Sequence, residues 1–158
     1  MKKIETVLLA GAVGLTQASI IYQWNPKAIQ ILATGERFIR YKENGLKVNQ
    51  EIIPFSLVNE VNKLGSPENP IYPDLIIIAC KYHHLEQVII DIKNYVGPDT
   101  LILSLLNGIS SEEIIGESYG AKRLPLAMIM GTDAQHKNES TTFKQKGTIY
   151  FGEKKILQ

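Results

Sequence analysis

Two glycines near the N-terminus have the spacing of a phosphate-binding turn. Residues 9–14 read Leu-Ala-Gly-Ala-Val-Gly, so Gly11 and Gly14 match the second and third glycines of G-x-G-x-x-G. Those positions let the backbone approach a dinucleotide pyrophosphate at the N-terminus of a helix. A plain strand-to-helix turn is the alternative. The candidate cofactor-binding residues of this turn are Leu9, Ala10, Gly11, Ala12, Val13 and Gly14.

Leu9 occupies the place of the motif's first glycine and adds bulk where the turn should be tight. Its side chain either points into the core or stands between the turn and the pyrophosphate. If residues 7–9 continue a buried strand, we expect Leu9 to pack against the helix that begins near Gly14. The turn is then displaced rather than blocked.

Arg37 is the candidate for recognising a phosphate on the adenosine ribose. Thr34 lies 20 residues beyond Gly14, where an NAD site places an acid to hold the ribose 2′-hydroxyl. Thr34 is neutral, so it does not repel a 2′-phosphate, and Arg37 is the nearest cation to attract one. We therefore expect a modest preference for NADPH over NADH. A solvated charge on a helix face explains Arg37 equally well.

Lys81 and Asn107 each follow a predicted buried strand directly. Ligands of open parallel sheets bind beyond the carboxyl ends of the strands, so both side chains are expected in the ligand crevice. A lysine and an amide at neighbouring strand ends suit an anionic or carbonyl ligand beside a cofactor. A loop position without function is the alternative for each.

We expect no metal site. His83 and His84 are adjacent at a helix start, where their side chains should point in different directions, and no third ligand is near them in the sequence. Cys80, at a strand end amid apolar residues, is interpreted as an inert core thiol.

Strands alternate with helices along the chain, which positions these residues. Continuous apolar runs predict buried strands, and helical spacing with Gly or Pro stops predicts helices. The expected strands cover 4–10, 28–33, 75–79, 100–106 and 124–130, with short ones at 46–48, 52–55 and 148–151. The expected helices cover 15–24, 36–44, 84–95 and 110–119. This order is that of an α/β fold, a doubly wound Rossmann-type parallel sheet with helices on both faces.

Composition restricts the class of protein. The 158 residues suffice for one domain, 1–158, and 44% hydrophobic with 21% charged residues excludes a disordered chain. With 17 Lys+Arg against 16 Asp+Glu, no electrostatic case arises for nucleic acid or an anionic membrane. No apolar run reaches the ~20 residues of a membrane span. A single cysteine excludes an internal disulfide and favours a cytoplasmic location.

The glycine turn, the stretch around Lys81 and the stretch around Asn107 together resemble the ketopantoate reductase (2-dehydropantoate 2-reductase) family. Two of them are fairly specific together: the lysine after one strand and the Asn-Gly after the next. The resemblance is carried by residues 11–15, 79–82 and 105–109 with Glu112 and Glu113, and by residues 35–37, 43–46 and 147–152.

The resemblance implies an oxidoreductase that reduces 2-dehydropantoate, a 2-oxo acid, to pantoate with NADPH on the route to coenzyme A. Residues 9–14 would hold the pyrophosphate, and Lys81 and Asn107 would face cofactor and substrate. Asn107 would lie near the nicotinamide ribose and the substrate oxygens. A homo-oligomer is compatible with this interpretation, and no nucleic acid or membrane partner is expected.

The chain departs from the family in three places. Leu9 replaces a glycine, and Thr34 replaces a common arginine. The family also has a second, all-helical domain that supplies the proton-donating lysine, and it should begin where this chain ends. We therefore assign no catalytic residue and expect the chain alone to be inactive. A stand-alone Rossmann nucleotide-binding module is the alternative, and a methyltransferase is a more distant one that leaves Lys81 and Asn107 unexplained.

Overall fold

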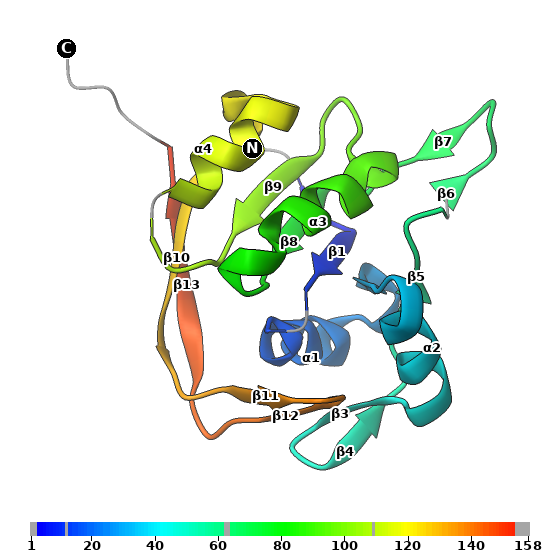
Figure 1. The fold of residues 1–158 in the computed structure, drawn as a ribbon, viewed down its shortest axis with the longest axis vertical. Helices are drawn as coiled ribbons and strands as arrows, with labels where there is room; N and C mark the ends of the chain where they lie inside the picture. Colours follow the sequence, from blue (N-terminus) through cyan, green and yellow to red (C-terminus); the bar gives the residue numbers. More distant parts are fainter. Residues whose placement is uncertain (1–2, 12, 62–63, 109, 154–158) are drawn as a thin grey trace.

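A five-stranded parallel sheet forms the centre of the computed structural model, which describes residues 3–11, 13–61, 64–108 and 110–153. Its strands are β1 (Val7–Ala10), β2 (Ile29–Leu32), β5 (Ser56–Val58), β8 (Leu75–Ile78) and β9 (Leu101–Ser104). They stand in the order β5-β2-β1-β8-β9, and every neighbouring pair is parallel. The predicted doubly wound sheet is confirmed (Figure 1).

Helices cover both faces of this sheet. The main helices are α1 (Leu15–Trp24), α2 (Gly35–Asn44), α3 (Leu85–Asp91) and α4 (Ser110–Tyr119). Neighbouring residues of β1 show the two faces: Leu9 shares a core with α1 and α2, and Leu8 shares one with α3 and α4. Short 3-10 helices complete the set at Pro26–Ala28, Tyr82–His84, Ile92–Tyr95 and Ala121–Arg123. Within the described ranges, no helix combines the length and apolar character of a bilayer span.

The short strand expected over 52–55 ends earlier, at Ile53, and a second strand that was not predicted begins at Ser56. The first is β4 (Glu51–Ile53), which pairs with β3 (Leu46–Val48), and the second is β5, an edge strand of the central sheet. The chain leaves one sheet and enters the other between them, around the buried Phe55. Between β5 and β8 the chain also forms a small antiparallel pair that was not predicted, β6 (Leu64–Gly65) and β7 (Pro70–Ile71).

The apolar run expected as a further parallel strand over 124–130 was assigned to the wrong sheet. It forms β10 (Leu126–Thr132), which pairs antiparallel with β13 (Lys146–Gly152) in a separate ribbon. Met128 and Met130 are exposed, whereas Ala127 and Ile129 on the other face are half-buried. Because β10 carries apolar side chains on both faces, its sequence resembles that of a fully buried strand, although one of its faces is exposed.

A polar hairpin between β10 and β13 was not predicted. Its strands β11 (Gln135–Lys137) and β12 (Ser140–Thr142) pair with each other, and β12 pairs parallel with β3. The sheet order is β11-β12-β3-β4. The Lys47 N–H donates to the Glu139 carbonyl at 2.8 Å, and the Asn49 N–H donates to the Thr141 carbonyl at 2.9 Å. The hairpin is therefore held beside the strand that follows α2 (Figure 1).

Candidate functional site

The glycine turn follows β1 and is fixed to the end of β8. Gly11 has φ +101°, and a Cβ there would lie 2.5 Å from the Ala79 carbonyl oxygen. The same oxygen accepts a hydrogen bond from the Val13 N–H at 2.9 Å. Only glycine gives this backbone both the positive φ and the close approach.

Leu9 points into the core, as expected, and lies under the start of α1. Its side chain is 0% exposed, and a Cβ at Gly14 would lie 2.6 Å from Leu9 Cδ1. Ala10 is also buried, so these two residues affect a ligand only through their backbone and the placing of the turn. Val13 presents an exposed side chain, and Ala12 lies outside the described residues.

A buried hydroxyl beside the turn has no partner. Among the described residues, Thr16 Oγ1 is a buried side-chain polar atom without a hydrogen bond, and it belongs to the first turn of α1. An unsatisfied buried group costs about 1–3 kcal/mol. The amides at the start of a helix and a free hydroxyl together form a donor set suited to an anionic oxygen.

A basic cavity of about 450 Å³ opens beside the turn. It brings together Arg37 and Lys81, which the sequence predicted on different elements, and adds Arg40, His84 and His136. The full lining is Val13, Arg37, Arg40, Tyr41, Cys80, Lys81, His84, His136 and Asn138. We name this space the basic cavity. Arg40 lies one helical turn after Arg37, so helical spacing in the sequence could have identified it. No local pattern in the sequence connects His136 to Arg37 or Arg40.

The electrostatics of the basic cavity favour an anion. Burial lowers the pKa of His136, and the positive charges of Arg37 and Lys81 lower it further. His84 is exposed to solvent, and its pKa is lowered by slight desolvation and by the neighbouring charges of His83, Arg37 and Lys81. Both histidines therefore stay neutral to lower pH than usual unless a negative charge enters. Burial raises the pKa of the Cys80 thiol to about 11, which disfavours the reactive thiolate.

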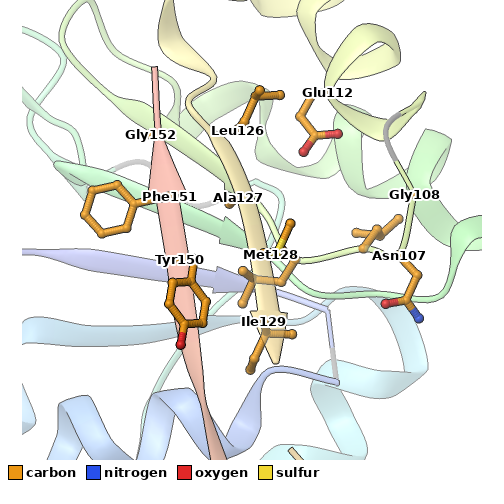
Figure 2. A pocket seen from close by; sticks show the side chains of 12 residues that line it. Asn107, Gly108, Glu112, Leu126, Ala127, Met128, Ile129, Tyr150, Phe151 and Gly152 are labelled. Atoms are coloured by element: carbon orange, nitrogen blue, oxygen red, sulfur yellow. The ribbon is translucent and has the colours of Figure 1, made fainter. Parts of the chain in front are cut away.

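Asn107 lies in a second, apolar groove at the end of β9. The groove has a volume of about 430 Å³. Figure 2 shows Asn107 on one side of this groove and Met128 and Ile129 of β10 on the other, and Glu112 of α4 also lines it. The full lining is Leu105, Leu106, Asn107, Gly108, Glu112, Leu126, Ala127, Met128, Ile129, Tyr150, Phe151 and Gly152. Lys81 and Asn107 thus follow neighbouring strands but line separate spaces.

Thr34 faces a buried acid. Its hydroxyl donates to Asp91 Oδ2 at 3.2 Å, and Gln87 Nε2 donates to Asp91 Oδ1 at 2.9 Å. Asp91 is buried with both oxygens occupied, so Thr34 serves the contact between β2 and α3. The Thr34 hydroxyl is therefore engaged within the fold rather than directed at a ligand.

No three or more His, Cys, Asp or Glu side chains come together as a metal site in the described ranges. The expectation that His83 and His84 point apart was wrong, because their ring centroids lie 4.1 Å apart. The helix begins there with a 3-10 turn, and α3 starts only at Leu85.

Sequence comparisons identify a family and curated relatives that match most of the chain. The family described as "Ketopantoate reductase PanE/ApbA" matches residues 6–155. The 2-dehydropantoate 2-reductase of Lactococcus lactis subsp. lactis (strain IL1403) is 31% identical over 120 residues, 74% of this chain and 37% of that protein. The chain spans about a third of the length of the curated relatives it matches.

Solved structures share the fold. The 2-dehydropantoate 2-reductase from Geobacter metallireducens GS-15 has a TM-score of 0.69 and 22% identity, over 92% of this chain and 49% of that one. The ternary structure of D-mandelate dehydrogenase with NADH and anilino(oxo)acetate has a TM-score of 0.73 and 22% identity, over 91% and 47%. At these identities the similarity establishes the architecture.

Proposed function

This chain belongs to the ketopantoate reductase family, and we propose that it binds NADPH for the reduction of 2-dehydropantoate to pantoate. The observation that carries the cofactor assignment is the basic cavity beside the glycine turn. It places Arg37, Arg40 and Lys81 around one space at the carboxyl ends of parallel strands, where nucleotides bind in this fold.

Each part of the site has a role in this proposal. The turn from Gly11 to Gly14 and the start of α1, including the Thr16 hydroxyl, hold the pyrophosphate. The basic cavity holds the phosphorylated adenosine end. The apolar groove beside Asn107 holds the nicotinamide end, and the cofactor there supplies a hydride.

Asn107 is proposed to orient the substrate's carbonyl. Its side chain is exposed in the groove, so its amide N–H groups are available to a carbonyl oxygen next to the nicotinamide. Hydrogen bonds aimed at an oxygen that gains negative charge stabilise the transition state. Because the curated relatives are about three times as long as the matched segment, we propose that these 158 residues bind cofactor and that turnover requires the rest of the family's length.

Replacing Arg37 by alanine should weaken NADPH binding roughly 10- to 100-fold, because a hydrogen bond to a charged group contributes about 1.5–3 kcal/mol. NADH binding should change less than twofold. Titrating both cofactors against protein fluorescence measures the ratio. Lys42→Ala, an exposed cation on the same helix that does not line the basic cavity, is the matched control.

Three results would reject parts of the proposal. An unchanged cofactor ratio in Arg37→Ala would make Arg37 a surface charge. Tighter binding of NADH than of NADPH would make NADH the cofactor, the nucleotide present in the solved D-mandelate dehydrogenase structure. Binding of neither cofactor would favour a Rossmann module without cofactor.

A further inference from the structure

We propose that His136 of the β11–β12 hairpin completes a phosphate pocket with Arg37 and Arg40 of α2, and that His136 takes up a proton when a ribose phosphate binds there. The ligand class is a phosphomonoester on the adenosine ribose. The inference rests on the proposed function for the identity of the nucleotide and adds residues and a pH dependence to it.

The two sides of this pocket come from distant parts of the chain. Arg37 and Arg40 lie one turn apart on α2, directly after β2, where the adenosine ribose of a dinucleotide is held in this fold. His136 lines the same cavity from the hairpin, which β3 fixes through the β12 pairing. Thr34 occupies the position where this fold usually recognises the ribose, but its hydroxyl donates a hydrogen bond to Asp91 instead.

His136 is held in place for this role. Its Nδ1 lies 2.8 Å from the hydroxyl of Thr141, which is 0% exposed, so the ring orientation is set by a buried partner. A histidine fixed at the wall of a cavity loses little conformational freedom when a ligand binds.

Charged and titratable groups from three parts of the chain lie around the cavity that His136 lines. Arg37 and Arg40 come from α2, Lys81 and His84 from the chain after β8, and Glu139 from the hairpin itself. Glu139 Oε1 lies 3.5 Å from Arg40 Nε, so part of the positive charge is already paired. Arg37 and Lys81 oppose protonation of His136, whereas Glu139 and the Asn138 backbone carbonyl favour it.

A dianionic phosphate reverses this balance. In the free protein the pKa of His136 is lowered, chiefly by burial. A phosphate beside the ring favours the charged form, so the pKa in the complex is higher than in the free protein. Binding therefore takes up a proton, and affinity rises as pH falls between the two pKa values.

The experiment compares 2′,5′-ADP with 5′-AMP, which differ by the phosphate in question. We expect the affinity ratio to rise roughly 3- to 10-fold between pH 8 and pH 6, up to the tenfold per pH unit of a single linked proton. Calorimetry at pH 7 in two buffers of different ionisation enthalpy should detect more proton uptake with 2′,5′-ADP than with 5′-AMP, because the 5′-phosphate is common to both ligands.

Variants separate His136 from its neighbours. His136→Gln should lose the pH-dependent rise and the proton uptake, leaving only the titration of the phosphate itself near pH 6. Arg40→Gln should lower 2′,5′-ADP affinity severalfold at every pH. His83→Gln, a histidine outside the cavity lining, should behave like the parent. His84→Gln should keep most of the rise, because His84 is exposed to solvent.

The outcomes distinguish this inference from the proposed function. If 5′-AMP and 2′,5′-ADP bind equally at all pH values, or if His84→Gln and not His136→Gln removes the rise, the phosphate pocket is wrong and nucleotide binding stands. If neither nucleotide binds and neither NADH nor NADPH binds, both proposals are overturned.

Discussion

Gly11→Ala should lower the free energy of unfolding by about 2–5 kcal/mol and remove measurable dinucleotide binding. An L-residue at positive φ costs roughly 1–2 kcal/mol, and forcing an extra carbon into a packed site costs about 1–3 kcal/mol. The new Cβ would lie 2.5 Å from the Ala79 carbonyl oxygen and 2.9 Å from Cys80 Cβ. The turn must then move off β8, breaking the bond from the Val13 N–H to Ala79.

Gly120→Ala is the matched control for Gly11→Ala. Gly120 has φ +89°, and a Cβ there meets nothing within 4 Å. In this variant the free energy of unfolding should fall only by the cost of an L-residue at positive φ, about 1–2 kcal/mol. It should bind NADH and NADPH like the parent. Urea unfolding and cofactor titration measure both. Equal destabilisation of the two variants with intact binding in both would show that the contact with Ala79 does not shape the site.

Leu9→Gly should lower stability by about 3–6 kcal/mol while tightening NADPH binding. Truncating a buried leucine to alanine costs about 2–5 kcal/mol, and glycine in a strand adds roughly 0.5–1 kcal/mol. Leu9→Gly also removes the side chain that packs against Gly14, so α1 and the turn can approach the sheet more closely. Stability and affinity should therefore change in opposite directions.

Leu8→Gly controls for the loss of stability. Leu8 is the neighbouring residue of β1, equally 0% exposed, but packs on the α3 and α4 face. It should be destabilised as much as Leu9→Gly without any gain in affinity. Leu9→Ala provides a milder variant should the glycine form unfold. If NADPH affinity does not rise in either Leu9 variant, Leu9 does not limit cofactor binding.

The parallel sheet and its helices were predictable because their signals are local. Runs such as Leu75–Ile78 are buried on both faces and therefore apolar throughout, and the predicted bounds of α1 and α4 match the structure. The edge strand Ser56–Val58 carries no such signal, since its Ser56 is exposed and only Val58 is buried. The polar strands of the hairpin, Gln135–Lys137 and Ser140–Thr142, owe their place to pairing with β3 rather than to composition.

The candidate site was predicted in part for the same reason. Arg37, Lys81 and the glycine turn could be placed because each follows a strand of the sheet. Their meeting with His136 depends on the hairpin, and spacing along the chain does not encode that contact. The assignment of Lys81 and Asn107 to one space failed because β10 and β13 enclose Asn107 separately.

The hairpin's attachment to β3 has a consequence for how the protein folds. The pair Ser140↔Lys47 closes a loop of more than ninety residues, and contacts between such distant segments form slowly because ordering the intervening chain opposes them. During synthesis the glycine turn and Arg37 emerge well before His136. Nascent chains that stop short of the hairpin would therefore have the turn and no enclosed basic cavity, and full affinity for a ribose phosphate would arise only when the last strands have docked.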